Sequence, residues 1–255
     1  MDVSLAAFLN EKADKYNCSE FIKNDPVQFP HAFSEKRDVE IAAFLASVIA
    51  WGNRRMIINS GKKLFGEIMG NHPYEYVMRS EWESAEGSVN IHRTFFMRDL
   101  AYLCRGLKYI YSGYDSMETI FTADDVWKGI EAFRSALICA NEGEASRHIS
   151  NPISEKGRPA SACKRLNMML RWLCRKDGIV DLGIWKNISP EKLMIPLDVH
   201  VARISRELGL LQRKQNDRKS VEMLTAQLRE LSPDDPVKYD FALFGIGVEE
   251  KSVNM

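Results

Sequence analysis

Apolar residues recur along most of this chain at spacings of three and four, which is the periodicity of amphipathic helices. Breaks rich in asparagine, glycine and proline separate these segments, and no segment shows the strict alternation of a half-buried strand. The pattern predicts helices over 3–16, 38–50, 54–69, 95–111, 124–141, 160–176, 199–208, 217–231 and 236–244. The polar stretches 80–90 and 142–159 are expected to be loops. Helices of ordinary length joined by short links predict a compact all-α protein.

The length and the charge distribution add a second constraint. The 255 residues, 45% of them hydrophobic, suffice for one large or two small domains. The formal net charge is zero, yet the segment 147–219 holds sixteen basic and seven acidic residues, which leaves 19 basic and 28 acidic residues elsewhere. A basic half can present a phosphate-binding face, although solvated helix faces also collect lysine and arginine.

The cysteines and the apolar runs restrict the cellular setting. The five cysteines are scattered without a C-x-x-C motif, which argues against a disulfide framework and a structural zinc site. Acidic residues interrupt the first sixteen positions, unlike a signal peptide, and the longest apolar run, 41–51, is too short to span a bilayer. We therefore expect a soluble cytoplasmic protein with no metal and no membrane contact.

The segment 195–208 carries the most specific pattern of the chain. Val201, Ile204 and Leu208 recur on one face of a helix that follows Pro196. Asp198 lies at the start of this helix, where a carboxylate can accept hydrogen bonds from the first-turn N–H groups and is favoured by the helix dipole. A simple helix cap is the alternative to a catalytic role for Asp198.

The predicted helix 160–176 supplies a candidate amine. Its apolar stripe consists of Leu166, Met169, Leu170 and Leu173. At 100° per residue, Lys164 and Arg171 fall opposite that stripe, so both are expected to point away from the core. An amine in this position can attack a sugar carbon or contact a phosphate, and the alternative is an ordinary solvated basic face.

The run Ile195-Pro-Leu-Asp-Val-His-Val-Ala-Arg resembles the aspartate segment of the helix-hairpin-helix (HhH-GPD) DNA glycosylases, the superfamily of endonuclease III and the 8-oxoguanine glycosylases. Around 178–180, where the common branch has its lysine, this chain has none, and no Leu-Pro-Gly-Val-Gly-like hairpin precedes it. The chain is closer to the divergent archaeal 8-oxoguanine glycosylase branch, whose lysine lies farther upstream. The resemblance implies that Lys164 displaces the base and forms a Schiff base while Asp198 assists. Lys156 and Lys176 are the alternatives for the amine.

The same resemblance implies a fold and further site residues. It implies two helical subdomains of DNA-glycosylase type with a cleft between them: a central bundle, 35–178, that carries the lysine helix, and a second subdomain, 1–34 with 179–255, that carries the aspartate. The corner at 51–54 is similar to the first helix pair of the superfamily, and the segment 235–248 resembles its closing helix. A helix cap, an ion pair or plain core packing are alternatives for several of these positions. The implied base-binding or DNA-binding residues are Trp51, Asn53, Arg54, Arg158, Arg165, Arg171, Arg175, Lys238 and Asp240.

The whole chain also resembles an uncharacterised bacterial family, DUF2400, through Lys164-Arg-Leu-Asn and Lys238-Tyr-Asp-Phe-Ala-Leu-Phe-Gly. No cysteine follows Cys174, so we expect no iron–sulfur cluster and no other cofactor. The expected function is base-excision repair by a monomeric, nucleoid-associated DNA glycosylase with AP-lyase activity. Its expected substrate is a flipped-out damaged purine, such as 8-oxoguanine, in double-stranded DNA. A non-catalytic helical nucleic-acid-binding protein and a helical protein-interaction module are the alternatives.

Overall fold

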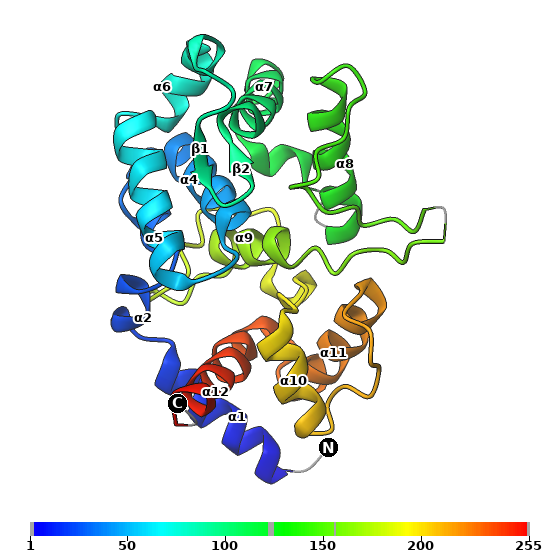
Figure 1. Ribbon diagram of the computed structural model, residues 1–255. Coiled ribbons are helices and arrows are strands. Elements are labelled where there is room, and N and C mark those ends of the chain that lie inside the picture. Colours follow the sequence, from blue (N-terminus) through cyan, green and yellow to red (C-terminus); the bar gives the residue numbers. More distant parts are fainter. Residues whose placement is uncertain (1–2, 122–124, 156, 254–255) are drawn as a thin grey trace. The chain divides into compact units, whose positions relative to one another are not determined.

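The computed structural model describes residues 3–121, 125–155 and 157–253, and these are mainly helical (Figure 1). Over the described residues, the only sheet has two short strands, so the all-α prediction is confirmed. The chain divides into two compact units. We call Ile22–Ser150 the central unit, and Met1–Phe21 with Asn151–Met255 the terminal unit. The short helix α2 (Ser19–Lys23) crosses the boundary between them.

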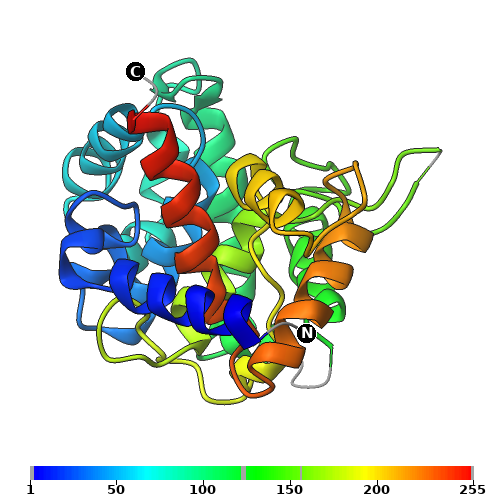
Figure 2. The same ribbon diagram turned by 90° about the horizontal axis from the view of Figure 1, so that it is seen from below.

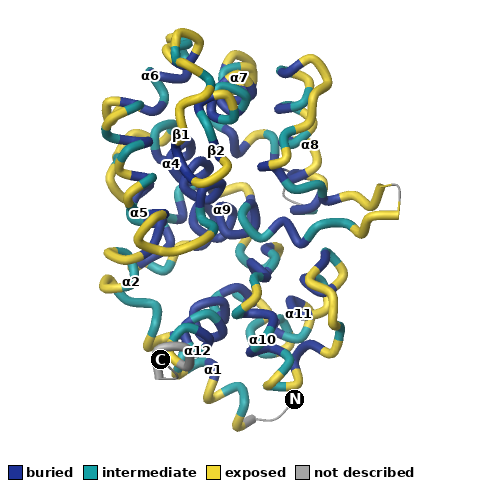
Figure 3. Tube along the Cα trace, viewed as in Figure 1, coloured by how far each residue is buried: buried dark blue, intermediate teal, exposed yellow. Residues whose placement is uncertain are grey.

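The central unit is built around α4 (Lys36–Ile49), in which every residue from Val39 to Ile49 is buried (Figure 3). The helices α3 (Gln28–His31) and α6 (Pro73–Met78) pack on α4. Two longer helices, α7 (Met97–Gly113) and α8 (Val126–Cys139), pack on each other. Phe44 of α4 meets Phe133 of α8 edge to face, with 5.0 Å between ring centroids. The near-continuous apolar run of α4 therefore marks a helix that is surrounded on all sides.

The middle of the central unit departs from the predicted helix bounds. The predicted helix 54–69 consists of α5 (Arg54–Lys62) and a π-helical turn, Lys63–Ile68. The predicted helix 95–111 begins two residues late, because Phe95–Phe96 forms strand β2, which pairs with β1 (Asn90–His92). Short 3₁₀ turns occupy Glu81–Ser84, inside the predicted loop, and Met117–Ile120. The predicted start of the next helix, residue 124, lies outside the described residues.

The terminal unit joins the two ends of the chain. Helix α12 (Tyr239–Val253) packs on α1 (Val3–Tyr16), which it crosses in Figure 2, and on α10 (Val199–Glu207). The close approach requires a glycine, because a Cβ at Gly245 would lie 2.2 Å from the ring of Tyr16. Helices α9 (Lys164–Cys174) and α11 (Arg218–Leu231) complete the unit, with 3₁₀ turns at Pro190–Lys192 and Pro236–Lys238.

The boundaries of the units differ from those expected. The chain divides near residues 22 and 151 instead of 35 and 178, so α9 groups with both termini. The backbone explains this, since the N–H of Arg218 donates to the carbonyl of Ala160 at 3.0 Å and thereby ties the approach to α9 to the start of α11. As a result, Lys164 and Asp198 belong to the same unit and do not come from opposite subdomains.

Two further expectations concern cysteines and membranes. No disulfide joins the five cysteines, all of which lie in the part of the chain that the structure describes. None of the described helices combines the length and the apolar character that crossing a membrane requires.

Candidate functional site

Asp198 caps α10, as the sequence predicts. Its backbone is extended, with φ of −106°, and its Oδ1 accepts hydrogen bonds from the N–H groups of His200 at 2.8 Å and Val201 at 2.9 Å. Its other oxygen, Oδ2, accepts no hydrogen bond from any residue that the structure describes. The cap therefore fixes the orientation of the carboxylate and leaves one oxygen for other contacts.

The approach to Asp198 is anchored on α11. The N–H of Ile195 donates to Oγ1 of Thr225 at 3.1 Å, and the side chains of Ile195 and Leu197 are buried. At the far end of α10, Nε of Arg206 donates to the carbonyl of Arg213 at 2.9 Å. The segment from Ile195 to Arg206 is thus attached at both ends, which gives Asp198 a defined place in the terminal unit.

Lys164 is the first residue of α9, so the predicted helix start at 160 is wrong by one turn. Cys163 precedes it in the left-handed region, with φ of 45°, and interrupts the helix there. Asn167 secures the entry, because its Nδ2 donates to the carbonyl of Ala162 at 3.0 Å. The corner therefore sets the direction in which the side chain of Lys164 leaves the backbone.

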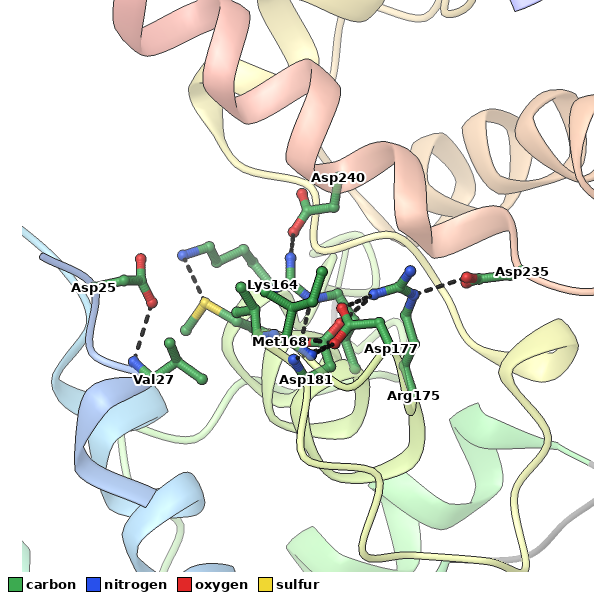
Figure 4. Close-up of polar contacts among 12 residues, drawn as sticks. Asp25, Val27, Lys164, Met168, Arg175, Asp177, Asp181, Asp235 and Asp240 are labelled. Carbon is green, nitrogen blue, oxygen red and sulfur yellow. Dashed lines mark hydrogen bonds and ion pairs between the residues drawn. The ribbon is translucent and has the colours of Figure 1, made fainter. Parts of the chain in front are cut away.

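The amine of Lys164 has an unusual environment. The residue is half-buried, and Nζ donates to the thioether Sδ of Met168, one helical turn later, at 3.5 Å (Figure 4). Sulfur is a weak acceptor. Lys164 forms no ion pair with any carboxylate among the described residues. The amine is thus partly removed from water without being held by a counter-ion.

Asp240, in the first turn of α12, is a buried acid on which the charges of both Lys164 and Asp198 act. Burial raises the pKa of Asp240 to about 6, against the opposing charge of its partner Arg171. Two further charges act on the same carboxyl, since Asp198 raises its pKa and Lys164 lowers it. The candidate amine and the candidate carboxylate therefore lie in the electrostatic neighbourhood of one buried acid. We call Lys164, Asp198 and Asp240 the lysine–aspartate cluster.

Beside this cluster, Arg171 of α9 forms a buried bridge. Its Nε donates to Oδ1 of Asp181 at 3.2 Å, and its Nη1 donates to Oδ2 of Asp240 (Figure 4). The guanidinium lies over the ring of Phe241, 4.2 Å from the centroid. The bridge connects α9 to α12 and holds the carboxyl of Asp240 in place.

Arg175, one helical turn later, extends the network. Its Nη1 donates to Asp181 at 2.9 Å and to Asp177, and its Nε donates to Asp235 at 2.8 Å. Burial alone lowers the pKa of Arg175, but Asp181 and Asp235 outweigh this and raise it. Burial raises the pKa of Asp181. The pKa of Asp177 is lowered instead, because hydrogen bonds from backbone N–H groups and the charge of Arg175 outweigh the effect of burial.

These positions correct the prediction for the two arginines. Arg171 and Arg175 were expected to offer charge to DNA phosphates, but they are 3% and 7% exposed and are engaged by carboxylates. A helical wheel places a charged residue opposite an apolar stripe, but it cannot include the acids that distant segments bring to that face. For Asp240, the ion-pair alternative holds, because its carboxyl is directed at Arg171.

The remaining predicted residues of the terminal unit are dispersed. Arg158 is exposed in the loop before α9, and Lys176 is exposed just after the end of that helix. Arg165 is half-buried, and burial lowers its pKa. Lys238 is half-buried, with its ammonium 5.0 Å from the centroid of the Tyr239 ring. Lys156 lies outside the described residues.

The predicted corner at 51–54 belongs to the central unit. Asn53 caps α5, since its Oδ1 accepts from the N–H groups of Arg55 at 3.0 Å and Met56 at 3.4 Å, which confirms the predicted cap. Arg54 is exposed. Trp51 is half-buried, and the guanidinium of Arg93 lies 4.8 Å from the centroid of its ring. The indole face is therefore partly occupied by an arginine.

The sequence reasoning missed the acids that surround the two arginines. A detectable signal precedes Asp181: Asp177-Gly178 follows the helix, and Oδ1 of Asp177 accepts from the N–H groups of Ile179 at 2.8 Å and Asp181 at 3.1 Å. Such a turn after an i, i+4 arginine pair could have indicated a local ion pair.

Within the described ranges, no group of three or more histidine, cysteine, aspartate or glutamate side chains could hold a metal ion.

Comparison with known proteins identifies the family but not an activity. The model of the family described as "Protein of unknown function (DUF2400)" matches residues 25–249. The match covers most of the 255 residues, so the chain belongs to this family, as predicted. Neither the curated proteins nor the solved structures contain a match to the chain.

Proposed function

We propose that this chain is a DNA glycosylase of helix-hairpin-helix type with AP-lyase activity, which acts on a damaged purine in double-stranded DNA. Lys164 supplies the nucleophilic amine, and Asp198 assists it. The observation that carries the proposal is the lysine–aspartate cluster. Lys164 is half-buried and has no carboxylate partner, and Asp198 caps a helix with one oxygen and leaves the other uncommitted. Both belong to one unit of the chain, and the charges of both affect the pKa of the buried Asp240.

The lysine meets the first chemical requirement of such a nucleophile. An amine that attacks the sugar carbon C1′ must be able to leave its resting contact, and a thioether at 3.5 Å holds an ammonium far less strongly than a carboxylate does. Partial burial also reduces competition from water for the approaching sugar. The buried ion pairs of Arg171 and Arg175 keep the nearby cations from taking Asp198 as their partner.

The chemistry then uses two groups. The target nucleotide must leave the base stack, because C1′ is inaccessible inside a duplex. The amine of Lys164 forms a bond to C1′, the glycosidic bond breaks, and its electron pair leaves with the base. Asp198 accepts the proton that the amine loses and stabilises the positive charge that develops on the sugar. The electron pair of the attached nitrogen then expels O4′ as the C1′–O4′ bond breaks, and O4′ takes up a proton, which gives the protonated Schiff base. Removal of a proton from C2′ lets the 3′-phosphate leave, which is the lyase step.

Borohydride trapping tests this proposal. The protein is incubated with a duplex that carries 8-oxoguanine and with a matched abasic duplex, and borohydride reduces any Schiff base to a stable covalent link. We expect a covalent complex that is lost in Lys164→Ala and retained in Lys176→Ala, a control at an exposed lysine near the end of the same helix. Trapping on the abasic duplex alone would retain the lyase and exclude 8-oxoguanine as its base.

Other outcomes would contradict the proposal. If Lys164→Ala is trapped as well as the wild type, the assignment of the nucleophile is wrong. If nothing is trapped although duplex binding weakens steeply with salt, the chain is a non-catalytic nucleic-acid-binding protein or a glycosylase that uses water. If no duplex is bound and a protein partner is bound in a salt-insensitive manner, the interaction-module alternative holds.

A further inference from the structure

We propose that the β1–β2 hairpin of the central unit is a binding surface for the phosphate backbone of duplex DNA, built from Lys63, Arg93, Arg98 and Arg147. We call these four residues the hairpin cations. The inference rests on the proposed function for its choice of DNA as the polyanion, but its residues lie outside the lysine–aspartate cluster, in the other unit of the chain.

The hairpin presents its turn to solvent. His92 and Phe95 are buried, whereas Arg93 and Thr94 between them are exposed. Arg93 has a φ of 51°, in the left-handed region, and its carbonyl accepts from Nδ2 of Asn90 at 2.6 Å, which closes the turn. A non-glycine residue in this conformation is uncommon, so the turn holds the side chain of Arg93 outward at a cost in backbone strain.

The four cations converge on this short hairpin from separate elements. Nζ of Lys63, the first residue of the π-helical turn after α5, donates to the carbonyl of Asn90 at 2.8 Å. Nη2 of Arg147 donates to the carbonyl of Thr94 at 2.7 Å. The guanidinium of Arg98 lies 4.7 Å from the centroid of the Phe96 ring. Each contact fixes a cation through a neutral group, so its full positive charge remains.

The absence of counter-ions distinguishes this surface. None of the hairpin cations forms an ion pair with a carboxylate in the described part of the chain, whereas Arg79 of the same unit pairs with Glu75. The carboxylate of Asp99, next to the hairpin, accepts from the N–H of Phe96 at 2.8 Å and lies 3.4 Å from Nε2 of His148. Uncompensated cations held on a rigid turn attract a polyanion.

His92 connects the hairpin to the corner at Trp51. Its Nε2 lies 2.8 Å from the carbonyl of Trp51, and because a carbonyl only accepts, Nε2 carries the proton. Nδ1 therefore accepts from the hydroxyl of Ser60 at 2.9 Å in a neutral ring. Burial lowers the pKa of His92, which favours that neutral form. His92 consequently joins the hairpin to the corner and to α5.

The composition of the surface favours duplex DNA. Three of its four cations are arginines, whose planar guanidinium forms paired hydrogen bonds with phosphate oxygens. Arg93 also stacks on the indole of Trp51, so a flat π-system lies directly beside the cations. The stacking contact holds the guanidinium of Arg93 at the surface, where phosphate oxygens can reach it.

The test measures binding of a fluorescein-labelled 20–30-bp undamaged duplex by anisotropy across a salt series. Replacing Arg93, Arg98 and Arg147 together by glutamine is expected to weaken binding roughly 30-fold or more near 0.15 M salt and to lower the slope of log K against log salt by roughly two to three. Arg79→Gln is the matched control and should change neither value. The triple Arg→Lys variant keeps the charge and should retain most of the slope, which separates lost charge from misfolding.

The outcomes distinguish this inference from the proposed function. Trapping at Lys164 with an unchanged salt slope in the glutamine triple variant would overturn the hairpin surface alone. A reduced slope without any trapping would support the surface and overturn the glycosylase. Hairpin-dependent binding to phosphatidylserine vesicles, with no binding to duplex DNA, would overturn the choice of DNA as the polyanion.

Discussion

Replacing Asp240 by asparagine tests the electrostatics of the lysine–aspartate cluster. The carboxyl of Asp240 is 7% exposed and is bonded to Arg171. Burial, only partly offset by Arg171, raises its pKa from the ordinary 3.8 to about 6. Asparagine has nearly the same shape and can still accept from Arg171, but it does not titrate. The substitution therefore removes both the titration and the negative charge that pairs with Arg171.

The sign of the effect follows from proton linkage. Between pH 3.8 and about 6, the unfolded chain releases the proton of Asp240 while the folded chain retains it, so folding loses stability as the pH rises through this window. Above about pH 7 both states are ionised and the contribution is constant. Each unit of pKa difference between the folded and unfolded chain is worth about 1.4 kcal/mol, so the rise from 3.8 to about 6 changes the free energy of unfolding by about 3 kcal/mol in total. About 2 kcal/mol of it falls between pH 4.5 and 7.5.

The assay is urea unfolding of the wild type and of Asp240→Asn at several pH values across that range. Tryptophan fluorescence follows the unfolding, and Trp172 and Trp185 are the buried tryptophans of the terminal unit. We expect Asp240→Asn to gain about 2 kcal/mol of unfolding free energy relative to the wild type as the pH rises from 4.5 to 7.5. Asp217→Asn is the control, because a hydrogen bond from Arg213 lowers the pKa of Asp217 to about 2, below the window. A wild-type-to-Asp240→Asn difference that stays constant over the range would refute the reasoning.

Substitutions at three further positions test other contacts. Arg171→Met leaves two buried carboxyls without their shared partner, so urea unfolding should show a loss of about 3–5 kcal/mol, and a loss below about 1 kcal/mol would exclude a stabilising bridge. Asp198→Asn should keep the cap and the stability of α10 while abolishing base release. Asp198→Ala should also lower the free energy of unfolding by about 1 kcal/mol. Retained base release in the asparagine variant would show that Asp198 is only a helix cap. Gly61→Ala places a Cβ 2.1 Å from the ring of Phe29 and should lower the unfolding free energy by about 1–3 kcal/mol, and an unchanged thermal midpoint would contradict that packing.

The helix bounds were most predictable for α1, α10 and α11, and a side-chain cap marks the start of the last two. The predicted helices 3–16, 199–208 and 217–231 agree with α1, α10 and α11 to within one residue at each end. Asp198 and Asp217 are caps in the structure, and each is an aspartate directly before a periodic apolar segment. Caps are local, so a sequence reveals them.

The start of α9 was less predictable, because long-range contacts determine it. Residues 160–163 continue the apolar pattern, yet the bond from Arg218 to the carbonyl of Ala160 and the left-handed Cys163 delay the helix to Lys164. The same limit applies to the buried face of the helix, where Asp240, 69 positions after Arg171, supplies the counter-charge. Periodicity within one segment contains no information about such a partner.

The position of the two candidate residues in one unit was also not predictable from their spacing. Lys164 and Asp198 were expected in separate subdomains, because a cleft between subdomains is what the resemblance implies. The ion pairs of Arg171 and Arg175 with Asp181, Asp235 and Asp240 instead hold α9 against segments from the C-terminal part of the chain. The acids that decide this are scattered through loops and the first turn of α12, where no single motif marks them.

The most direct test of the central claim is peptide mapping of the borohydride-trapped complex. The wild-type protein is trapped on an abasic duplex, the DNA is digested to a nucleotide remnant, and the protein is cleaved and sequenced by mass spectrometry. We expect the remnant on Nζ of Lys164. A remnant on another lysine, or on the N-terminal amine, would contradict the assignment of Lys164 and Asp198 as the reacting pair.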